Sequence, residues 1–273
     1  MIYDENQCQL GEGPLWHPLR KQLFWFDILG QRLHTRGHHW QFDTYVSAAG
    51  WIDSDTLLVA SAQALNKFTI STGAHETVCE LEADNIVTRS NDGRADPFGG
   101  FWIGTMGINA EDGAGAIYRY YEGELRQLYA PITISNAICF SPDSKTAYFT
   151  DTPTQQIMRV ALDSEGWPVS DPVLHIDLQG TPFRPDGAII DANGNLWNAQ
   201  WGVGRVAGYD LKGQFFESFS FAGCQSSCPA FGGDDLTTLF CTSAAVGLDG
   251  PEQGKTFAVE TNILGQKEHQ VIL

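Results

Sequence analysis

SPDSKTAYFTD at residues 141–151 and DANGNLWNAQWG at residues 191–202 share one pattern, a turn-forming stretch that runs into a short aromatic strand. Four further segments follow the same pattern, and they begin at His17, Ile52, Asp96 and Gly232. The units carry a large apolar residue at comparable positions, roughly 33 to 49 residues apart: Trp25, Leu58, Trp102, Tyr148, Trp197 and Phe240. This spacing suits one four-stranded blade per unit. The sequence therefore predicts an all-β fold, a six-bladed β-propeller with four-stranded blades around a central channel, although five or seven blades are also compatible with it.

The chain has 273 residues, and neither a Pro/Ser-rich linker nor a run of like charges divides it. We therefore expect one propeller domain over residues 1–273. The 29 glycines and 12 prolines suit many turns, and no stretch shows convincing helical spacing of apolar residues, so helices should be rare. A propeller protects its edges by closing its ring. Closure predicts that residues 2–3 or 9–10 join the last blade beside residues 255–260 or 271–273.

The formal charge of −17 argues against two classes of partner, because an acidic surface repels the phosphates of nucleic acids and anionic membrane lipids. No apolar run approaches the length of a membrane span, and the N-terminal MIYDENQCQL lacks the features of a signal peptide. Most of the six cysteines stand in apolar, strand-like contexts. We expect a reduced, cytoplasmic protein, with a Cys224–Cys228 bridge as the alternative for that one pair.

Three segments depart from ordinary blade strands by placing an oxygen-bearing side chain at the start of a predicted inner strand. They are LGEGPLW (residues 10–16), ISNAICF (134–140) and FRPDGAII (183–190), and the side chains belong to Glu12, Asn136 and Asp186. Taken singly, each residue could simply order a turn or hold the backbone. Their shared position in three units favours convergence at the mouth of the channel. Two carboxylates and an amide oxygen suit Ca²⁺, Mg²⁺ or Mn²⁺, and Zn²⁺ also accepts such ligands.

A fourth segment, TRSNDGRADPFGGFWIGTM at residues 88–106, contains two candidate substrate-binding residues. The guanidinium of Arg89 offers a planar fork of donors for hydroxyl or carboxylate oxygens. The amide of Asn91 both donates and accepts hydrogen bonds, which suits a polyhydroxylated ligand. The alternative interpretation is an ordinary Asn-Asp-Gly turn with a surface Arg–Asp pair.

LGEGPLW, RSNDG followed by GTM, ISNAICF and RPDGAIID together resemble, in order, the motifs of the regucalcin/gluconolactonase family, also called senescence marker protein. The resemblance covers nearly the whole chain. It implies a six-bladed propeller with one divalent metal ion in the central channel, held by Glu12, Asn136 and Asp186. It also implies that Arg89 and Asn91 contact substrate. Two departures stand out, namely ISNA in place of ISNG, and GINAEDGAGAIYRY (residues 107–120), where only Glu111 could act as the substrate-binding glutamate that some members carry.

The resemblance implies metal-dependent hydrolysis of a sugar lactone, an aldonolactone, to the open-chain aldonic acid. The metal would polarise the carbonyl, and Asp186 would act as general base, with Asp151 in reserve. One alternative is a metal-dependent esterase or organophosphate hydrolase, and another is a Ca²⁺-binding propeller scaffold without turnover. The expected partner is a small-molecule lactone, and the chain is expected to be a monomer or a homodimer.

Overall fold

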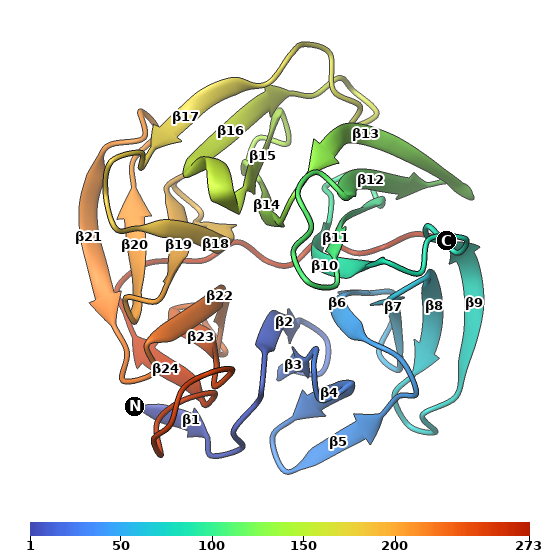
Figure 1. The fold of residues 1–273 in the computed structure, drawn as a ribbon, viewed down its shortest axis with the longest axis horizontal. Coiled ribbons are helices and arrows are strands. Elements are labelled where there is room, and N and C mark those ends of the chain that lie inside the picture. The colour runs from blue at the N-terminus through green and yellow to red at the C-terminus, as the bar shows by residue number, and fades with distance from the viewer.

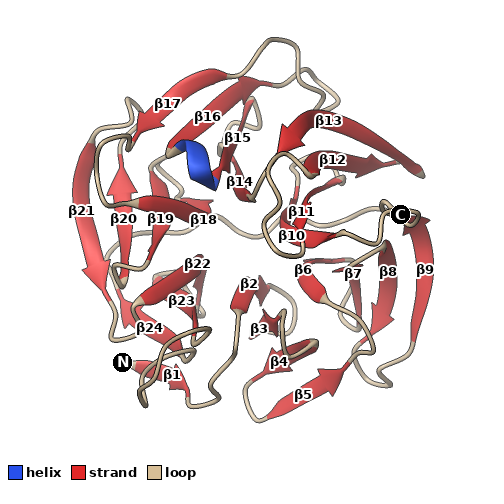
Figure 2. Ribbon diagram, viewed as in Figure 1, coloured by secondary structure: helices blue, strands red, loops and turns tan.

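The computed structural model describes residues 1–273 and consists of six four-stranded antiparallel sheets arranged in a ring (Figures 1 and 2). The predicted six-bladed propeller is confirmed. Within each blade the strands follow one another outward from the ring centre. The only helical element is a short 3-10 turn, η1 (Thr152–Thr154), which agrees with the expectation that helices are rare. No helix in the structure has the length and apolar character needed to cross a membrane.

The blades have the following strands. Blade 1 contains β2 (Gly11–His17), β3 (Gln22–Asp27), β4 (Arg32–Thr35) and β5 (His38–Gln41). Blade 2 contains β6 (Val46–Trp51), β7 (Thr56–Ser61), β8 (Ala64–Thr69) and β9 (His75–Glu80). Blade 3 contains β10 (Thr88–Ala95), β11 (Phe101–Gly107), β12 (Gly115–Tyr121) and β13 (Glu124–Ile132). Blade 4 contains β14 (Ser135–Phe140), β15 (Thr146–Asp151), β16 (Gln156–Ala161) and β17 (Val173–Asp177). Blade 5 contains β18 (Arg184–Ile190), β19 (Leu196–Trp201), β20 (Arg205–Tyr209) and β21 (Phe215–Ser220). Blade 6 contains β22 (Gln225–Gly232), β23 (Thr238–Ala244), β24 (Thr256–Glu260) and the N-terminal β1 (Ile2–Asp4).

The large apolar residue of each sequence unit lies on the second strand of its blade. These residues are buried: Trp25, Leu58, Trp102, Tyr148, Trp197 and Phe240. The second strand packs against a neighbouring blade on each face, which explains its continuous apolar character. Accordingly, the hydrophobic core is divided into six clusters, one between each pair of adjacent blades.

The N-terminal strand closes the ring. In β1, Ile2 pairs with Phe257 of β24, so residues 2–3 and 255–260 are the segments that meet. Leu10 adds a single bridge to Ala244 in the same blade. The alternative that residues 271–273 take part in closure is wrong, because β24 already occupies the position beside β1.

The C-terminal segment after β24 crosses the end of the channel where the inner strands finish, and Figure 1 shows it passing behind the blades. Gln266 Nε2 donates to the carbonyl oxygens of Phe140 and Ile190, both at 3.1 Å, at the ends of β14 and β18. Glu268 then forms a buried ion pair with Arg94 of β10, with 2.6 Å between Oε1 and Nη1. This end of the channel is therefore covered, and only the end where the inner strands begin is left to receive a ligand.

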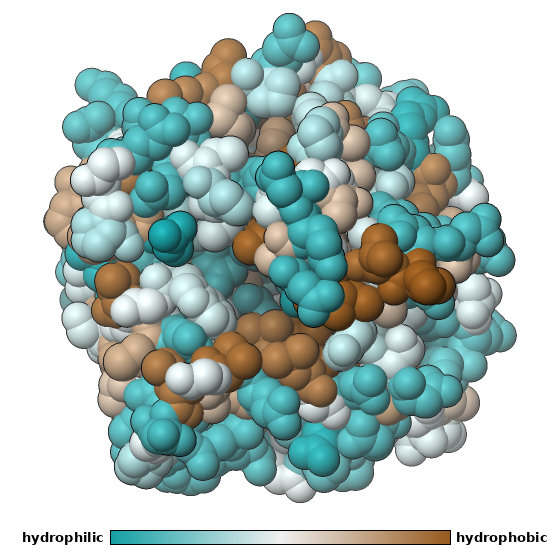
Figure 3. Space-filling model, viewed as in Figure 1, coloured by the Kyte–Doolittle hydropathy of each residue, from teal (hydrophilic) through white to brown (hydrophobic).

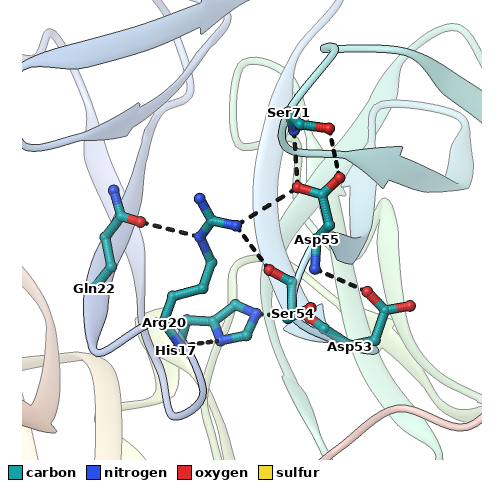
Figure 4. Close-up of polar contacts among 7 residues, drawn as sticks. All are labelled: His17, Arg20, Gln22, Asp53, Ser54, Asp55 and Ser71. Atoms are coloured by element: carbon teal, nitrogen blue, oxygen red, sulfur yellow. Dashed lines mark hydrogen bonds and ion pairs between the residues drawn. The ribbon is translucent and has the colours of Figure 1, made fainter.

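Polar contacts between turns also join adjacent blades (Figure 4). His17 is buried at the end of β2, and its ring nitrogen Nε2 lies 2.9 Å from the carbonyl oxygen of Asp53. Arg20 Nη1 donates to the carbonyl oxygen of Ser54 at 2.8 Å and lies 3.5 Å from the carboxylate of Asp55. The β2–β3 turn of blade 1 thereby holds the β6–β7 turn of blade 2.

Candidate active site

A β-bulge near the start of each inner strand positions the site. The register shifts after Glu12 in β2, Ser90 in β10, Asn136 in β14 and Pro185 in β18, and equivalent shifts occur in β6 and β22. A bulge leaves extra residues unpaired and turns their side chains away from the regular alternation. Glu12 and Asn136 stand at the last paired position before the bulge, and Asp186 lies within it. The same local irregularity thus directs three side chains from three blades toward the channel.

These side chains line a cavity of about 320 Å³. Its polar lining consists of Glu12, Arg89, Asn91, Asn136, Thr152, Arg184 and Asp186. Its apolar lining consists of Leu10, Met106, Ile134, Pro153, Trp201 and Val246. The cavity lies on the face shown in Figure 3, where apolar side chains border hydrophilic ones near the centre. The structure therefore brings together five of the predicted site residues: Glu12, Arg89, Asn91, Asn136 and Asp186.

The side-chain amide of Asn136 is oriented by its neighbours. Its Nδ2 donates to Thr152 Oγ1 at 2.9 Å, and that hydroxyl in turn donates to the carbonyl oxygen of Pro185 at 2.7 Å. The Oδ1 of Asn136 has only a long contact of 3.3 Å, with Asn91 Nδ2. The amide therefore presents its oxygen toward the cavity. Ala137 stands where the family motif has glycine, and it adopts a left-handed φ of 57°, a strained conformation for alanine. The backbone thus keeps a conformation that glycine favours, and Asn136 lines the cavity despite the substitution.

Two buried carboxylates face the cavity, and their environment disfavours negative charge. Burial, with repulsion from Asp92 as the next contribution, raises the pKa of Glu12 to about 8. Burial raises the pKa of Asp186 well above its usual range, and the charges of Glu12 and Asp92 raise it further. Because a bound cation favours the charged form of both groups, this pair has the electrostatic character of a cation site.

Asp92 is a third carboxylate of the cluster that the sequence did not single out. It is buried behind the cavity lining, and its Oδ2 accepts a hydrogen bond from the amide of Ile138 at 2.7 Å. Burial raises its pKa to about 6, while the positive charge of Arg94 opposes that shift. Asp92 therefore has a cationic partner within the protein, Arg94. Glu12 feels only a small effect of Arg89, and no positive side chain offsets the charge of Asp186.

Arg89 and Asn91 form a pair on the cavity wall. Arg89 Nη1 donates to Asn91 Oδ1 and to the carbonyl oxygen of Ser90, both at 2.8 Å. Asn91 Nδ2 donates to the carbonyl oxygen of Ser135 at 2.8 Å. Burial lowers the pKa of Arg89 to about 10, so its guanidinium stays charged at neutral pH. Its Nε–H is buried without a hydrogen-bond partner, and an unpaired donor of this kind gains from contact with a ligand oxygen.

The structure does not bring Glu111 or Asp151 into the cavity lining. Glu111 is exposed on the β11–β12 loop, where it accepts hydrogen bonds from the backbone amide and side-chain Nδ2 of Asn109 at 3.0 and 2.9 Å. Asp151 at the end of β15 accepts from the backbone amides of Thr133 and Ile134 at 3.1 and 2.9 Å. The carboxylate of Asp151 thus holds the entry to β14.

Thr152, Arg184 and Trp201 also line the cavity, and the sequence did not indicate them. Thr152 stands in a Thr-Pro-Thr stretch that has the composition of an ordinary turn. Arg184 is exposed at the start of β18, and Trp201 ends the neighbouring β19. The available signals were the proximity of Thr152 to Asp151 and of Arg184 to Asp186 and, for Trp201, its place in the turn-and-strand unit DANGNLWNAQWG.

The residues present fit a divalent cation. Glu12 and Asp186 provide carboxylate oxygens, and Asn136 provides an amide oxygen whose nitrogen is already engaged by Thr152. Oε2 of Glu12 accepts a hydrogen bond from the amide of Gly13 at 3.0 Å, and its Oε1 is left to bind an ion. An all-oxygen set is the chemistry that Ca²⁺, Mg²⁺ and Mn²⁺ prefer.

Residues 10–245 match the SMP-30/Gluconolactonase/LRE-like region, which spans all the cavity-lining strands described above. This chain belongs to the SMP-30/gluconolactonase/LRE-like family. The family membership predicted from the sequence motifs is therefore confirmed. The family's sequence pattern reaches from just before Glu12 to the end of β23, so it includes every inner strand of the ring.

Individual SMP-30/gluconolactonase relatives are similar over nearly their full length. The chain is 41% identical to the "Putative sugar lactone lactonase" of Rhizobium meliloti, over 97% of this chain and 94% of that protein. It is 33% identical to a 6-deoxy-6-sulfogluconolactonase of Pseudomonas putida, over 95% of this chain and 94% of that protein. The crystal structure of a calcium-binding protein, regucalcin, from Agrobacterium tumefaciens is 39% identical, covers 100% of this chain and 97% of its own, and superimposes with a TM-score of 0.97.

Proposed function

We propose that this chain hydrolyses a sugar lactone, an aldonolactone, to its open-chain aldonic acid, and that the reaction depends on one divalent metal ion held by Glu12, Asn136 and Asp186. The observation that carries the proposal is the meeting of two buried carboxylates and one oriented amide oxygen beside the Arg89–Asn91 pair. The names of the lactonase relatives support the same reaction class, which makes the protein a carboxylic ester hydrolase. The calcium-binding neighbour supports a divalent ion.

The residues divide the chemistry between them. When bound, a divalent ion would polarise the lactone carbonyl and stabilise the negative charge that develops on its oxygen. Asp186 accepts a proton from the attacking water through the carboxylate oxygen that faces the cavity. The water oxygen then bonds to the carbonyl carbon, the ring C–O bond breaks, and the departing ring oxygen takes the proton from Asp186 to become a hydroxyl, which leaves a carboxylic acid and restores the Asp186 carboxylate. General-base assistance of this kind contributes about 10² to 10⁴ in rate.

Arg89 and Asn91 orient the substrate. The unpartnered Nε–H of Arg89 gains a hydrogen bond when a substrate oxygen reaches it. Asn91 is already fixed by Arg89 and by Ser135, so it meets the substrate without losing side-chain freedom. A polyhydroxylated lactone supplies both the acceptor oxygens and the donors that this pair needs.

The test is acid release from a panel of aldonolactones, followed with a pH indicator and corrected for spontaneous ring opening. The protein is stripped with a chelator and refilled with Ca²⁺, Mg²⁺, Mn²⁺ or Zn²⁺ in turn. Metal-dependent release from one or a few lactones is expected. A stripped protein that works as fast as the refilled one contradicts the role of the metal. No release with any ion contradicts lactone hydrolysis, and an aryl ester and a phosphofluoridate in the same panel then test for another hydrolase.

A further inference from the structure

Three buried side chains with metal-ligating atoms meet outside the central cavity, where the chain enters its first blade. Cys8 precedes β2, Asp27 ends β3 and His34 lies on β4. The thiol sulfur of Cys8, a carboxylate oxygen of Asp27 and a ring nitrogen of His34 all lie within 4.8 Å of one another. Their exposed fractions are 1%, 4% and 4%. The lactone-site residues are not among them, so this cluster is a separate feature of the molecule.

The imidazole of His34 is the observation that points to a ligand. Neither Nδ1 nor Nε2 has a hydrogen-bond partner, although the ring is almost fully buried. Buried polar atoms in native proteins are nearly always paired, and an unpaired one is destabilising. The ring stacks on Trp25 with 5.6 Å between centroids and 12° between planes, which fixes its orientation. A bound cation would use one of these orphaned nitrogens.

The propeller contains its own comparison, because blade 4 repeats the local structure of blade 1 without the cluster. Asp27 accepts hydrogen bonds from the amides of Gln9 and Leu10 at 3.0 and 2.9 Å. In blade 4, Asp151 accepts from the amides of Thr133 and Ile134 with the same sequence offsets. At the offsets of Cys8 and His34, blade 4 has Ile132 and Met158, which pack in an apolar cluster. The aspartate therefore belongs to the blade architecture, whereas the thiol and the imidazole are additions specific to blade 1.

We propose that Cys8, Asp27 and His34 form a second cation site, which binds Zn²⁺ and is distinct from the all-oxygen centre of the cavity. A thiolate, an imidazole and a carboxylate are the ligand types that zinc accepts, and the thiolate and imidazole disfavour Ca²⁺ and Mg²⁺. Tetrahedral zinc bonds place ligand atoms about 3.4 to 3.6 Å apart. The atoms already lie within 4.8 Å of one another, so modest side-chain movement closes the site. A water molecule takes the fourth position.

The protonation states of the metal-free cluster are consistent with this site. Burial lowers the pKa of His34 to about 4, so the imidazole is neutral and has a free lone pair at pH 7. Burial raises the pKa of the Cys8 thiol and the negative charge of Asp27 raises it further, so the thiol is protonated in the metal-free protein. Zinc binding therefore displaces one proton, from Cys8 Sγ to solvent, as the S–Zn bond forms.

The location suggests what the ion would do, because Cys8 belongs to the seam where the ring closes. Its amide donates to the carbonyl oxygen of Gly254 at 2.8 Å, and its carbonyl oxygen accepts from the amide of Ala245 at 3.1 Å, both in blade 6. Asp27 and His34 belong to blade 1. Zinc would thus link the segment attached to blade 6 with two strands of blade 1 and stabilise the closed ring by mass action.

The test uses Co²⁺ as a spectroscopic substitute for zinc in the chelator-treated, reduced, full-length protein. With the central cavity saturated with Ca²⁺, a thiolate-to-cobalt charge-transfer band should appear in the near ultraviolet, saturate at one equivalent and disappear when Zn²⁺ is added. Ions in the all-oxygen cavity give no such band, so the reading does not depend on lactone hydrolysis. Zinc should also raise the melting temperature of protein whose central cavity is already saturated with Ca²⁺. Cys8→Ser and His34→Gln should remove both effects, whereas Cys224→Ser and Cys79→Ser, which change exposed or half-buried thiols elsewhere, should retain them.

Absence of the band in the wild-type protein with excess Co²⁺ overturns the proposal, as does a band that survives Cys8→Ser in a variant with a native circular dichroism spectrum. If the variants do not fold, zinc-edge anomalous diffraction from wild-type crystals decides instead. A peak between Cys8, Asp27 and His34 supports the site. Anomalous signal confined to the central cavity, or absent, rejects it.

Discussion

Asn136 Nδ2 of β14 donates to Thr152 Oγ1 of η1 across 2.9 Å, a contact within blade 4. The Thr152 hydroxyl in turn donates to the carbonyl oxygen of Pro185, the residue before Asp186, and this second hydrogen bond joins blade 4 to β18 of blade 5. Two of the three proposed metal ligands are therefore held in mutual position by a residue that is not itself a ligand. Groups that orient ligands in this way commonly matter as much as the ligands for metal affinity.

Thr152→Val should weaken metal binding about 10- to 100-fold, because it removes the hydroxyl that fixes the Asn136 amide. Thr152→Ser keeps the hydroxyl and should retain most of the affinity. Isothermal titration with Ca²⁺ or Mn²⁺ on chelator-treated protein measures the difference. Equal affinities for the valine and serine variants would show that Thr152 does not position Asn136.

Asp186→Asn should reduce kcat at least about 10²-fold, because the amide cannot accept the proton of the attacking water. The measurement is acid release from the best lactone at saturating metal. Asp151→Asn is the matched control, since the Asp151 carboxylate accepts from the backbone amides of Thr133 and Ile134 instead of facing the cavity. An Asp186→Asn variant that retains more than about a tenth of the activity excludes Asp186 as the general base.

The metal-free protein should lose stability as the pH rises from about 5 to about 8. Glu12 has an ordinary pKa of 4.5 and a pKa of about 8 when folded. Between these values the folded state holds a proton that the unfolded state has released, so the free energy of unfolding falls as pH increases. Added Ca²⁺ should raise the melting temperature more at pH 8 than at pH 6, because the carboxylates must be deprotonated to bind it.

Differential scanning calorimetry of stripped protein across this range tests that dependence, and Glu12→Gln should reduce it, while Asp186 and Asp92 keep a part of it because burial also raises their pKa values. A change of 1 kcal/mol shifts the melting temperature of a domain of this size by about 2–4 °C, so the effect is measurable. A melting temperature in the stripped wild type that is constant between pH 5 and 8 would contradict the raised pKa of the buried Glu12 carboxyl group.

Glu111→Gln should change KM for the lactone by less than about twofold, as is usual for exposed side chains away from a binding site. Its carboxylate accepts from Asn109 and is not part of the cavity lining. Asn91→Ala is the comparison. Asn91 lines the cavity, so this substitution should raise KM for the lactone. A tenfold or larger rise in KM for Glu111→Gln would instead assign Glu111 the substrate-binding role implied by the family resemblance.

Most of the fold could be predicted because each blade satisfies the same local requirements. Residue types that suit tight turns predict turns such as residues 191–195. Residue types that suit burial on both faces of a sheet predict strands such as Leu196–Trp201. Repetition then reveals the blade count. Closure by residues 2–3 and 255–260 follows from the same reasoning, whereas the C-terminal segment could not be placed, because its binding to Phe140, Ile190 and Arg94 has no local signature.

The sequence by itself determined which residues could serve as oxygen ligands, since Glu12, Asn136 and Asp186 interrupt strands that are otherwise apolar. Only the tertiary structure decided what surrounds them. Thr152 has the sequence context of any turn residue, and Asp92 that of an Asn-Asp-Gly turn, until the ring places both beside the cavity. The Cys8, Asp27 and His34 cluster likewise arises from three separate segments. Contacts between blades depend on bulges and on ring closure, which set side-chain directions across distant parts of the chain and leave no periodic trace in it.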